Sequence, residues 1–190
     1  MASVSPSAGG QKSHWVFGYG SLIWYPGFAF VRSELALLNG AHRSLCIYSH
    51  RHRGTPEVPG LVFGLMKGGS CRGMAFEVAA DTWPEVYEYL LAREQDTGVY
   101  REATRPVRLV SGEIVSALAF LVNEDHPQFA GRLSVDEQLR MVRAGFGQSG
   151  ANVDYVLNTA THLEQMGIPD SQLRELVGLL RDRKEIAAER

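Results

Sequence analysis

The sequence predicts an α+β fold: a small mixed or antiparallel, barrel-like sheet with packed helices, and a helical C-terminal third. Strand-like apolar segments fill most of the first half, a single amphipathic helical stripe interrupts them, and helices close the chain. This order lacks the regular alternation of strand and helix that builds a doubly wound parallel sheet. We expect residues 14–190 to form a single domain and residues 1–13, which are small and polar, to form a flexible tail.

The first half supplies the strands and one helix. Strand-like segments occur at 14–17, 28–32, 43–48, 61–66 and 71–79, the last with apolar residues at every second position. A helix follows, with Asp81 as the expected N-cap and Pro84 in its first turn. Its apolar residues recur at helical spacing and predict a helix to about residue 95: Trp83, Val86, Tyr87, Leu90 and Leu91.

Two strands and three helices are expected in the second half. Strands at 107–110 and 114–122 are joined by a predicted tight turn at residues 111–113. Ser134 and Glu137 form a capping box for a helix that reaches about Arg143. A second helix spans about 152–166 and ends at a Gly-Ile-Pro stop signal, and Asp170 caps the third.

Composition excludes several classes of function. The net charge is −2, without the basic excess of a nucleic-acid-binding protein. Two cysteines, Cys46 and Cys71, are too few for a disulfide framework and fit a reducing cytoplasm. Residues 1–13 lack the apolar core of a signal peptide, and no apolar stretch is long enough to span a membrane. We therefore expect a cytoplasmic protein with neither nucleic-acid nor membrane partners.

Glu94 lies where the apolar stripe of the first predicted helix would continue, four residues after Leu90 and three after Leu91. A carboxylate on a buried face has two explanations. Either the stripe has ended and Glu94 reaches solvent or pairs with an arginine such as Arg93 or Arg101, or Glu94 lines an apolar pocket. In a pocket its pKa would rise, and it could act as general base and acid near neutral pH.

The segment Gly18-Tyr19-Gly20-Ser21 ends the first predicted strand and is the candidate partner of that acid. Main-chain N–H groups at a glycine-rich turn can bind a carboxylate, a phosphate or an oxyanion. The segment is not a P-loop, which needs Gly-Lys-Ser/Thr, nor a dinucleotide fingerprint, which needs a third glycine and a helix. A bulge or tight bend without function remains the alternative.

Other polar clusters give weaker signals. His50 and His52 have metal-binding spacing, but no further ligands are evident. Arg51 or Arg53 fits a substrate carboxylate, and a solvated basic loop is the alternative. The two cysteines are expected to be buried apolar residues; nothing in the spacing supports a Cys–His nucleophile.

Taken together, four segments resemble the ChaC-like γ-glutamylcyclotransferases: VFGYGSLIW, TPEVPGLVFGLMKGGSCRGMAFEV, YLLAREQDTGVY and GQSGANVDYVLNT. They occur in family order and cover roughly residues 14–180. The resemblance implies a barrel-like α+β fold, no metal or organic cofactor, and glutathione as the substrate, cleaved to 5-oxoproline and Cys-Gly. A cyclotransferase for other γ-glutamyl amino acids or amines, or a non-catalytic regulatory binder, are the alternatives.

The resemblance also implies roles for individual residues. Glu94 is the expected catalytic acid and base, and Tyr100 closes the same motif and is expected to help hold substrate. Val99 before Tyr100 departs from the family's RE…GY segment and bears on pocket shape. Contact with the γ-glutamyl group is expected from the glycine loop. Arg53 is expected to bind a substrate carboxylate because of the pairing chemistry of arginine, not because of the resemblance. That loop comprises Gly18, Tyr19, Gly20, Ser21, Leu22 and Ile23.

Overall fold

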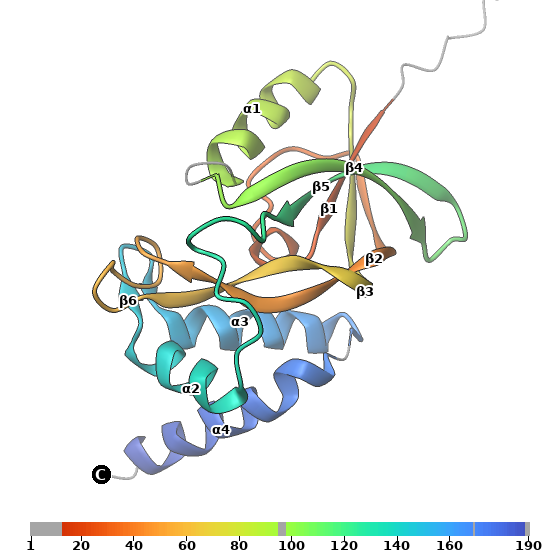
Figure 1. Cartoon of the computed structure of the whole chain (residues 1–190). Coiled ribbons are helices and arrows are strands. Elements are labelled where there is room, and N and C mark those ends of the chain that lie inside the picture. The colour runs from red at the N-terminus through yellow and green to blue at the C-terminus, as the bar shows by residue number, and fades with distance from the viewer. Residues whose placement is uncertain (1–12, 95–97, 169, 189–190) are drawn as a thin grey trace, which may run out of the picture.

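The computed structural model describes residues 13–94, 98–168 and 170–188. Five strands form a closed barrel in the order β1-β3-β2-β4-β5 (Figure 1). They are β1 (His14–Gly18), β2 (Arg32–Ser49), β3 (Gly60–Val78), β4 (Tyr100–Leu109) and β5 (Ile114–Val122). Neighbours are antiparallel except where β5 runs parallel to β1 and briefly to β3. The predicted mixed, barrel-like sheet is therefore confirmed, whereas residues 1–12 of the expected tail lie outside the described residues.

The hairpin of β2 and β3 is longer than the sequence predicts. The expected segments 61–66 and 71–79 are parts of one 19-residue strand, and 43–48 is only the end of an 18-residue partner. Register shifts between Asn39 and Ala41, and between Leu45 and Ile47, interrupt the pairing without ending it. Such bulges bend a strand, which explains why the apolar pattern looked broken.

Two predicted strands differ from the structure. The expected strand at 28–32 does not form, because β2 begins only at Arg32. Its aromatic residues pack instead, with the Phe28 and Phe30 rings on Phe76 at centroid distances of 5.7 and 5.1 Å. The predicted strand at 107–110 is the end of β4, which begins at Tyr100. The turn at 111–113 is confirmed by the hydrogen bond from the Leu109 N–H to the Glu113 carbonyl, 2.8 Å.

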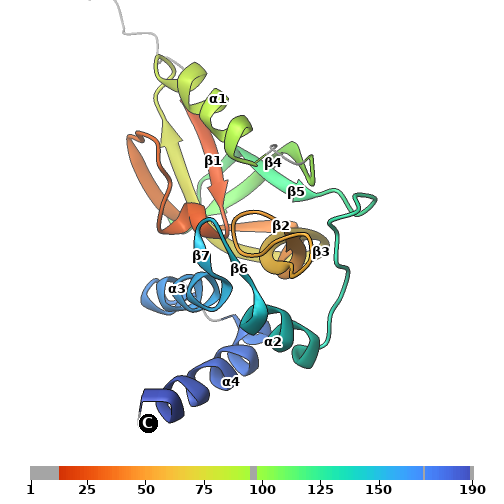
Figure 2. The same ribbon diagram turned by 90° about the vertical axis from the view of Figure 1, so that its left-hand side faces the viewer.

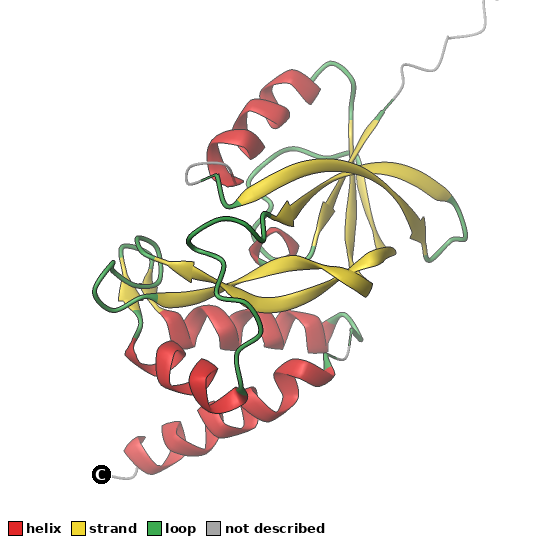
Figure 3. Ribbon diagram, viewed as in Figure 1, coloured by secondary structure: helices red, strands yellow, loops and turns green. Residues whose placement is uncertain are grey.

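Helices cover the strands on two sides (Figure 3). Helix α1 (Trp83–Glu94) lies on one side, and α2 (Val135–Ala144), α3 (Asn152–Gln165) and α4 (Ser171–Ala188) pack together along β2 and β3 on the other (Figure 2). The capping box of Ser134 and Glu137 is present. Asp170 accepts from the Leu173 N–H at 3.2 Å, as a cap of α4 should. Helix α1 begins at Trp83, so Thr82 rather than Asp81 precedes it.

The apolar core is shared between the barrel and the helices. One cluster joins barrel residues such as Leu38 and Leu65 with Val156 of α3 and Leu176 of α4. A second joins Val86 and Leu90 of α1 to the strands it covers. Burial of this size fixes both helical layers on the barrel and so fixes the segments between them. None of the helices within the described residues is long and apolar enough to cross a membrane.

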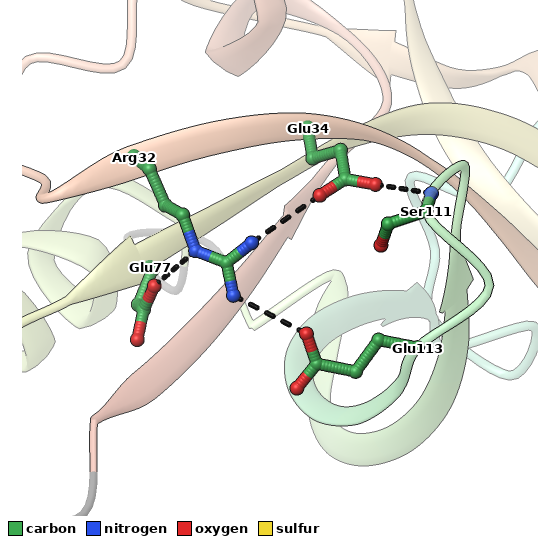
Figure 4. Close-up of polar contacts among 5 residues, drawn as sticks. All are labelled: Arg32, Glu34, Glu77, Ser111 and Glu113. Atoms are coloured by element: carbon green, nitrogen blue, oxygen red, sulfur yellow. Dashed lines mark hydrogen bonds and ion pairs between the residues drawn. The ribbon is translucent and has the colours of Figure 1, made fainter.

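Arg32 ties strand ends together at the end of the β2–β3 hairpin remote from loop 50–59 (Figure 4). Its Nη1 and Nη2 lie 3.3 and 3.2 Å from Glu34 and Glu113, and its Nε lies 2.5 Å from Glu77. Glu34 also accepts from the Ser111 N–H at the β4–β5 turn. Because Arg32 is 45% exposed, we expect these ion pairs to contribute little to stability.

Candidate active site

A cavity of about 520 Å³ lies beside the tip of the β2–β3 hairpin, and four segments supply much of its lining, together with residues of β2 and β3, Gln128 and Ser149. The four segments are the turn after β1, hairpin loop 50–59, the junction of α1 with β4, and the first turns of α3. Four of the predicted site residues share this cavity: Ser21, Arg53, Glu94 and Tyr100. The remaining predicted residues of the glycine loop are not among its lining side chains.

Glu94 is the last residue of α1, and its side chain is 14% exposed. Burial raises the pKa of this carboxyl group, and the neighbouring Arg93 guanidinium partly opposes the rise. The Arg93 Nε lies 3.3 Å from Glu94 Oε1, whereas Arg101 is exposed and pairs with Asp125. Both explanations from the sequence thus hold in part, since Glu94 pairs with Arg93 and also lines the cavity. Among the described lining residues it is the sole carboxylate.

The glycine loop bends sharply where β1 ends and continues into a 3₁₀ turn, η1 (Ser21–Ile23). A side chain at Gly18 would bring its Cβ within 3.1 Å of Leu22 Cβ and of the Phe76 ring, which is tighter than ordinary packing allows. A Cβ on Gly73 of β3 would lie only 2.3 Å from the Gly18 carbonyl oxygen. Close approach of the backbone therefore requires glycine at position 73, whereas a side chain at position 18 would need Leu22 and Phe76 to shift by a few tenths of an ångström.

Gly20 is under less steric pressure. Its φ of −123° is accessible to any residue, and an added Cβ would stand 3.7 Å from Phe63 Cβ and from the Tyr155 hydroxyl. This is ordinary contact distance, so a methyl group fits, while a larger branched side chain would press toward Tyr155.

The side chains of the glycine loop point mainly into the protein. Leu22 packs in the cluster under α1, Ile23 in the main core, and Tyr19 is 5% exposed. Burial, followed by the neighbouring Tyr100 and Glu94, raises the pKa of Tyr19 well above its ordinary value. The acid lies near the loop, because Arg93 contacts both Glu94 and Ser21. Any substrate contact by these residues remains a prediction for their main-chain groups.

Arg43 supports the loop from beneath and was not predicted as a site residue. Its Nε donates to the Tyr19 carbonyl at 2.5 Å and its Nη2 to the Arg72 carbonyl at 2.6 Å. Its Nη1 pairs with Asp170, the cap of α4, at 2.8 Å, with the arginine side chain 5% exposed. The single signal in the sequence was a charged residue at the head of an apolar strand segment.

Arg93 connects the two halves of the site. Its Nη2 donates to Ser21 Oγ at 2.9 Å, and its Nη1 to the Tyr25 carbonyl and the Tyr89 hydroxyl, both at 2.8 Å. One guanidinium group therefore holds the end of α1, with Glu94, against the turn that follows Gly20.

Hairpin loop 50–59 forms the basic rim of the cavity. It lies against the short hairpin of β6 (Phe146–Gly147) and β7 (Gly150–Ala151), where the Gln148 and Ser149 N–H groups donate to the carbonyls of residues 51 and 52. Arg53 Nη1 donates to the Ser149 carbonyl at 2.5 Å and the Ala151 carbonyl at 3.3 Å. Burial lowers the pKa of Arg53. The loop is thus held in place by backbone hydrogen bonds and by Arg53, while residues 51, 52 and 55–58 remain exposed to solvent.

His50 and His52 also lie on this rim. His52 Nδ1 is 3.0 Å from Ser149 Oγ, and the His50 ring stacks on Tyr48. Within the described part of the chain, no three His, Cys, Asp or Glu side chains are grouped so as to hold a metal ion.

Two tyrosines complete the inner wall, and both bind the backbone of Phe63 in β3. The Tyr100 hydroxyl donates to the Phe63 carbonyl at 2.9 Å. The Phe63 N–H donates to the Tyr155 hydroxyl oxygen at 3.2 Å. Tyr155 was not predicted as a site residue, although it stands in the GQSGANVDYVLNT segment.

A family model and several curated proteins match most of this chain. A family model described as ChaC-like protein matches residues 14–183. A glutathione-specific γ-glutamylcyclotransferase of Escherichia coli K12 is 31% identical over 163 residues, 86% of this chain and 71% of that protein. A glutathione-specific γ-glutamylcyclotransferase 1 of Danio rerio is 35% identical over 167 residues, covering 85% and 84%.

The fold agrees with these sequence matches. A crystal structure of a γ-glutamyl cyclotransferase specific to glutathione from yeast superposes with a TM-score of 0.82 at 24% identity, covering 90% of this chain and 96% of that one. A second solved structure, named γ-glutamyl cyclotransferase, gives a TM-score of 0.54 at 14% identity and covers 87% of this chain and 86% of that one.

Proposed function

The chain belongs to the ChaC-like protein family, and on that premise we propose that it is a γ-glutamylcyclotransferase that degrades glutathione to 5-oxoproline and Cys-Gly. Its curated relatives carry this activity in their names, with identities near 30% over most of their length. The structural observation that carries the proposal is the buried carboxylate of Glu94, facing a cavity large enough for a tripeptide.

The reaction needs a proton carrier rather than a protein nucleophile. Glutathione brings its own nucleophile, the γ-glutamyl α-amine, which at neutral pH is mainly an ammonium ion and cannot attack. Glu94 takes a proton from it, and the freed amine attacks the γ-carbonyl carbon to close a five-membered ring. Glu94 returns protons to the departing cysteinyl nitrogen as the amide bond breaks. No proton is consumed overall, because Cys-Gly leaves as an ammonium.

The environment of Glu94 suits this task. A carboxyl group at its ordinary pKa is a weak base toward an ammonium ion, and burial strengthens it by raising the pKa. Arg93 keeps the carboxylate ionised in part and ties it to Ser21. The acid and the glycine loop are thereby held at fixed positions around the substrate, and such positioning can supply several kcal/mol of the barrier reduction.

We assign the predicted binding residues as follows. Main-chain N–H groups of the glycine loop, residues 18–22, face the γ-glutamyl group, whereas the Ile23 N–H donates to the Gly20 carbonyl at 3.0 Å within the loop. The Tyr100 hydroxyl donates its hydrogen bond to the Phe63 carbonyl. Only an oxygen lone pair is then left for substrate, and it accepts a hydrogen bond from the α-amine. Arg53 uses Nη1 for two backbone carbonyls, which leaves Nη2 for the glycine carboxylate of glutathione.

The basic rim favours glutathione over smaller γ-glutamyl compounds. Four consecutive residues of loop 50–59 are histidine or arginine and line the cavity. A γ-glutamylamine has no second carboxylate for them, and γ-glutamyl-alanine carries its carboxylate nearer the γ-amide than glutathione does. Electrostatic attraction across the rim therefore selects the tripeptide.

Incubation of the purified protein with reduced glutathione tests the proposal, with 5-oxoproline and Cys-Gly quantified by mass spectrometry. Both products should appear in equal amounts. γ-Glutamyl-alanine, supplied in parallel, should be a poor substrate. Turnover of the dipeptide but not of glutathione would show that the protein is a cyclotransferase for another γ-glutamyl substrate. Binding of glutathione without any product would favour a regulatory binder.

We also propose that residues 14–190 act as one domain in the cytoplasm. Both cysteines are free and buried, which suits a reducing compartment. Fractionation of cells that express the tagged chain would show which compartment contains the protein.

A further inference from the structure

We infer that the Tyr155 hydroxyl donates a hydrogen bond to the γ-carbonyl oxygen of the substrate as that oxygen gains negative charge during ring closure. The inference rests on the proposed function and assigns a second chemical group beside Glu94. It concerns a residue of α3, far along the chain from the glycine loop and from α1.

The direction of the hydrogen bonds around Phe63 leads to this assignment. A carbonyl oxygen can only accept, so Tyr100 spends its proton on the Phe63 carbonyl. An N–H group can only donate, so Tyr155 uses an oxygen lone pair toward Phe63 and keeps its own proton. Within the described residues, that proton has no hydrogen-bond acceptor. The two tyrosines that bind Phe63 therefore offer opposite hydrogen-bonding groups to the cavity. Tyr100 offers an acceptor, and Tyr155 offers a donor.

The position of Tyr155 suits the reacting carbonyl. It lines the same cavity as Glu94, and its oxygen is 3.7 Å from where a Cβ on Gly20 would lie. The hydroxyl therefore stands beside the glycine loop that faces the γ-glutamyl group. Arg53 stacks on the Tyr155 ring, with the guanidinium carbon 5.2 Å from the ring centre. The ring is 7% exposed and cannot swing away from this position without disturbing the packing of α3.

The tyrosine stays protonated under working conditions. Burial raises the pKa of Tyr155 to about 12, the hydrogen bond from Phe63 opposes the rise, and the charge of Glu94 adds to it. Arg53 and Arg93 lower the pKa slightly. A neutral hydroxyl in a desolvated wall is a donor fixed in advance, which stabilises charge in the transition state more than charge in the ground state.

Replacing Tyr155 with phenylalanine removes the donor and keeps the ring. We expect kcat for glutathione to fall by about 10²–10³-fold with little change in KM, as for other removed oxyanion donors. Tyr87→Phe is the matched control, because the Tyr87 hydroxyl bonds Glu102 on the exposed surface. It should retain wild-type kinetics. Thermal unfolding of both variants shows whether the lost Phe63 contact has disturbed the fold.

A second substitution separates proton donation from structure. Incorporation of 3,5-difluorotyrosine at position 155 keeps the hydroxyl that accepts from Phe63 but lowers the phenol pKa. The basic limb of the kcat–pH profile should then move to lower pH, whereas the same substitution at position 87 should leave the profile unchanged. A purely structural role for Tyr155 would not produce this shift.

Three results would overturn the inference. They are wild-type kcat in a folded Tyr155→Phe variant, a rise in KM with kcat preserved, and a basic limb unmoved by fluorination. The second would mean that Tyr155 holds a substrate group in the ground state. Absence of product from the wild-type protein would instead refute the proposed function itself, so the two failures are distinguishable.

Discussion

Glu94→Gln separates the chemical role of this acid from its structural role. Glutamine has nearly the same shape and can still accept from Arg93, but it can neither take nor return a proton. General acid–base catalysis typically contributes 10²–10⁴-fold, which corresponds to about 3–5 kcal/mol of transition-state stabilisation. Because no other carboxylate lines the described part of the cavity, we expect kcat to fall by at least the lower of these factors.

The assay is steady-state release of 5-oxoproline, accompanied by glutathione binding measured by calorimetry. The variant should bind glutathione with an affinity close to that of the wild type, since Ser21, Arg53 and Tyr100 are untouched. Glu88→Gln is the matched control, because Glu88 is an exposed residue of the same helix. It should show no loss of rate.

Stability should change in the opposite direction to activity. The folded protein binds the Glu94 proton more tightly than the unfolded chain does, because burial raises the pKa in the fold. The ionised side chain therefore destabilises the fold above its folded pKa, and this penalty disappears below the ordinary glutamate value. The Tm of Glu94→Gln should exceed that of the wild type at neutral pH, and the two should converge in acid.

Retained activity would refute this reasoning. If a folded Glu94→Gln variant kept more than about a hundredth of the wild-type kcat, the missing factor would be below the range expected for a proton carrier. The base would then have to be another group, and His50 and His52 on the rim are the candidates to replace next.

Three further substitutions probe the supports of the site. Arg43→Met should lower the free energy of unfolding in urea by about 3 kcal/mol, because the ion pair between Arg43 and Asp170 is largely buried; a double variant that also carries Asp170→Asn should recover part of the loss. Arg93→Gln should move the acid limb of the kcat/KM profile to higher pH, since it removes the charge that opposes the rise in the Glu94 pKa; an unmoved limb would show that the ion pair is unimportant. Gly73→Ala should lower the Tm by several degrees, because its Cβ would meet the last carbonyl of β1 at 2.3 Å, and wild-type stability would contradict the close approach.

Local rules predicted the helices well because the signals that end a helix are themselves local. The capping box at Ser134 and the cap at Asp170 lie within four residues of the groups they bind. The stripe of α1 likewise placed Glu94 on an inward face. Strand boundaries were predicted less accurately, because a run of aromatic residues such as Phe28 is found in packed loops as well as in strands.

The predicted site residues stand in recognisable segments of the sequence, whereas the roles of the missed residues are evident only from their distant partners. Arg43 reaches Tyr19, Arg72 and Asp170, which no pattern within its own strand reveals. Tyr155 meets Phe63 across 92 positions of the chain. The resemblance to a family identified Glu94 and the glycine loop. The direction of the hydrogen bonds between the two tyrosines and Phe63 is evident only from the structure.

The wall formed by loop 50–59 and the β6–β7 hairpin has a consequence for synthesis on the ribosome. The barrel strands emerge within the first 122 residues, but the surface against which Arg53 rests does not exist until Ser149 and Ala151 have been made. A nascent chain that already carries the acid therefore lacks one side of its substrate chamber. On the roles proposed for Arg53 and Tyr155, we expect catalysis to begin only after α3 has emerged.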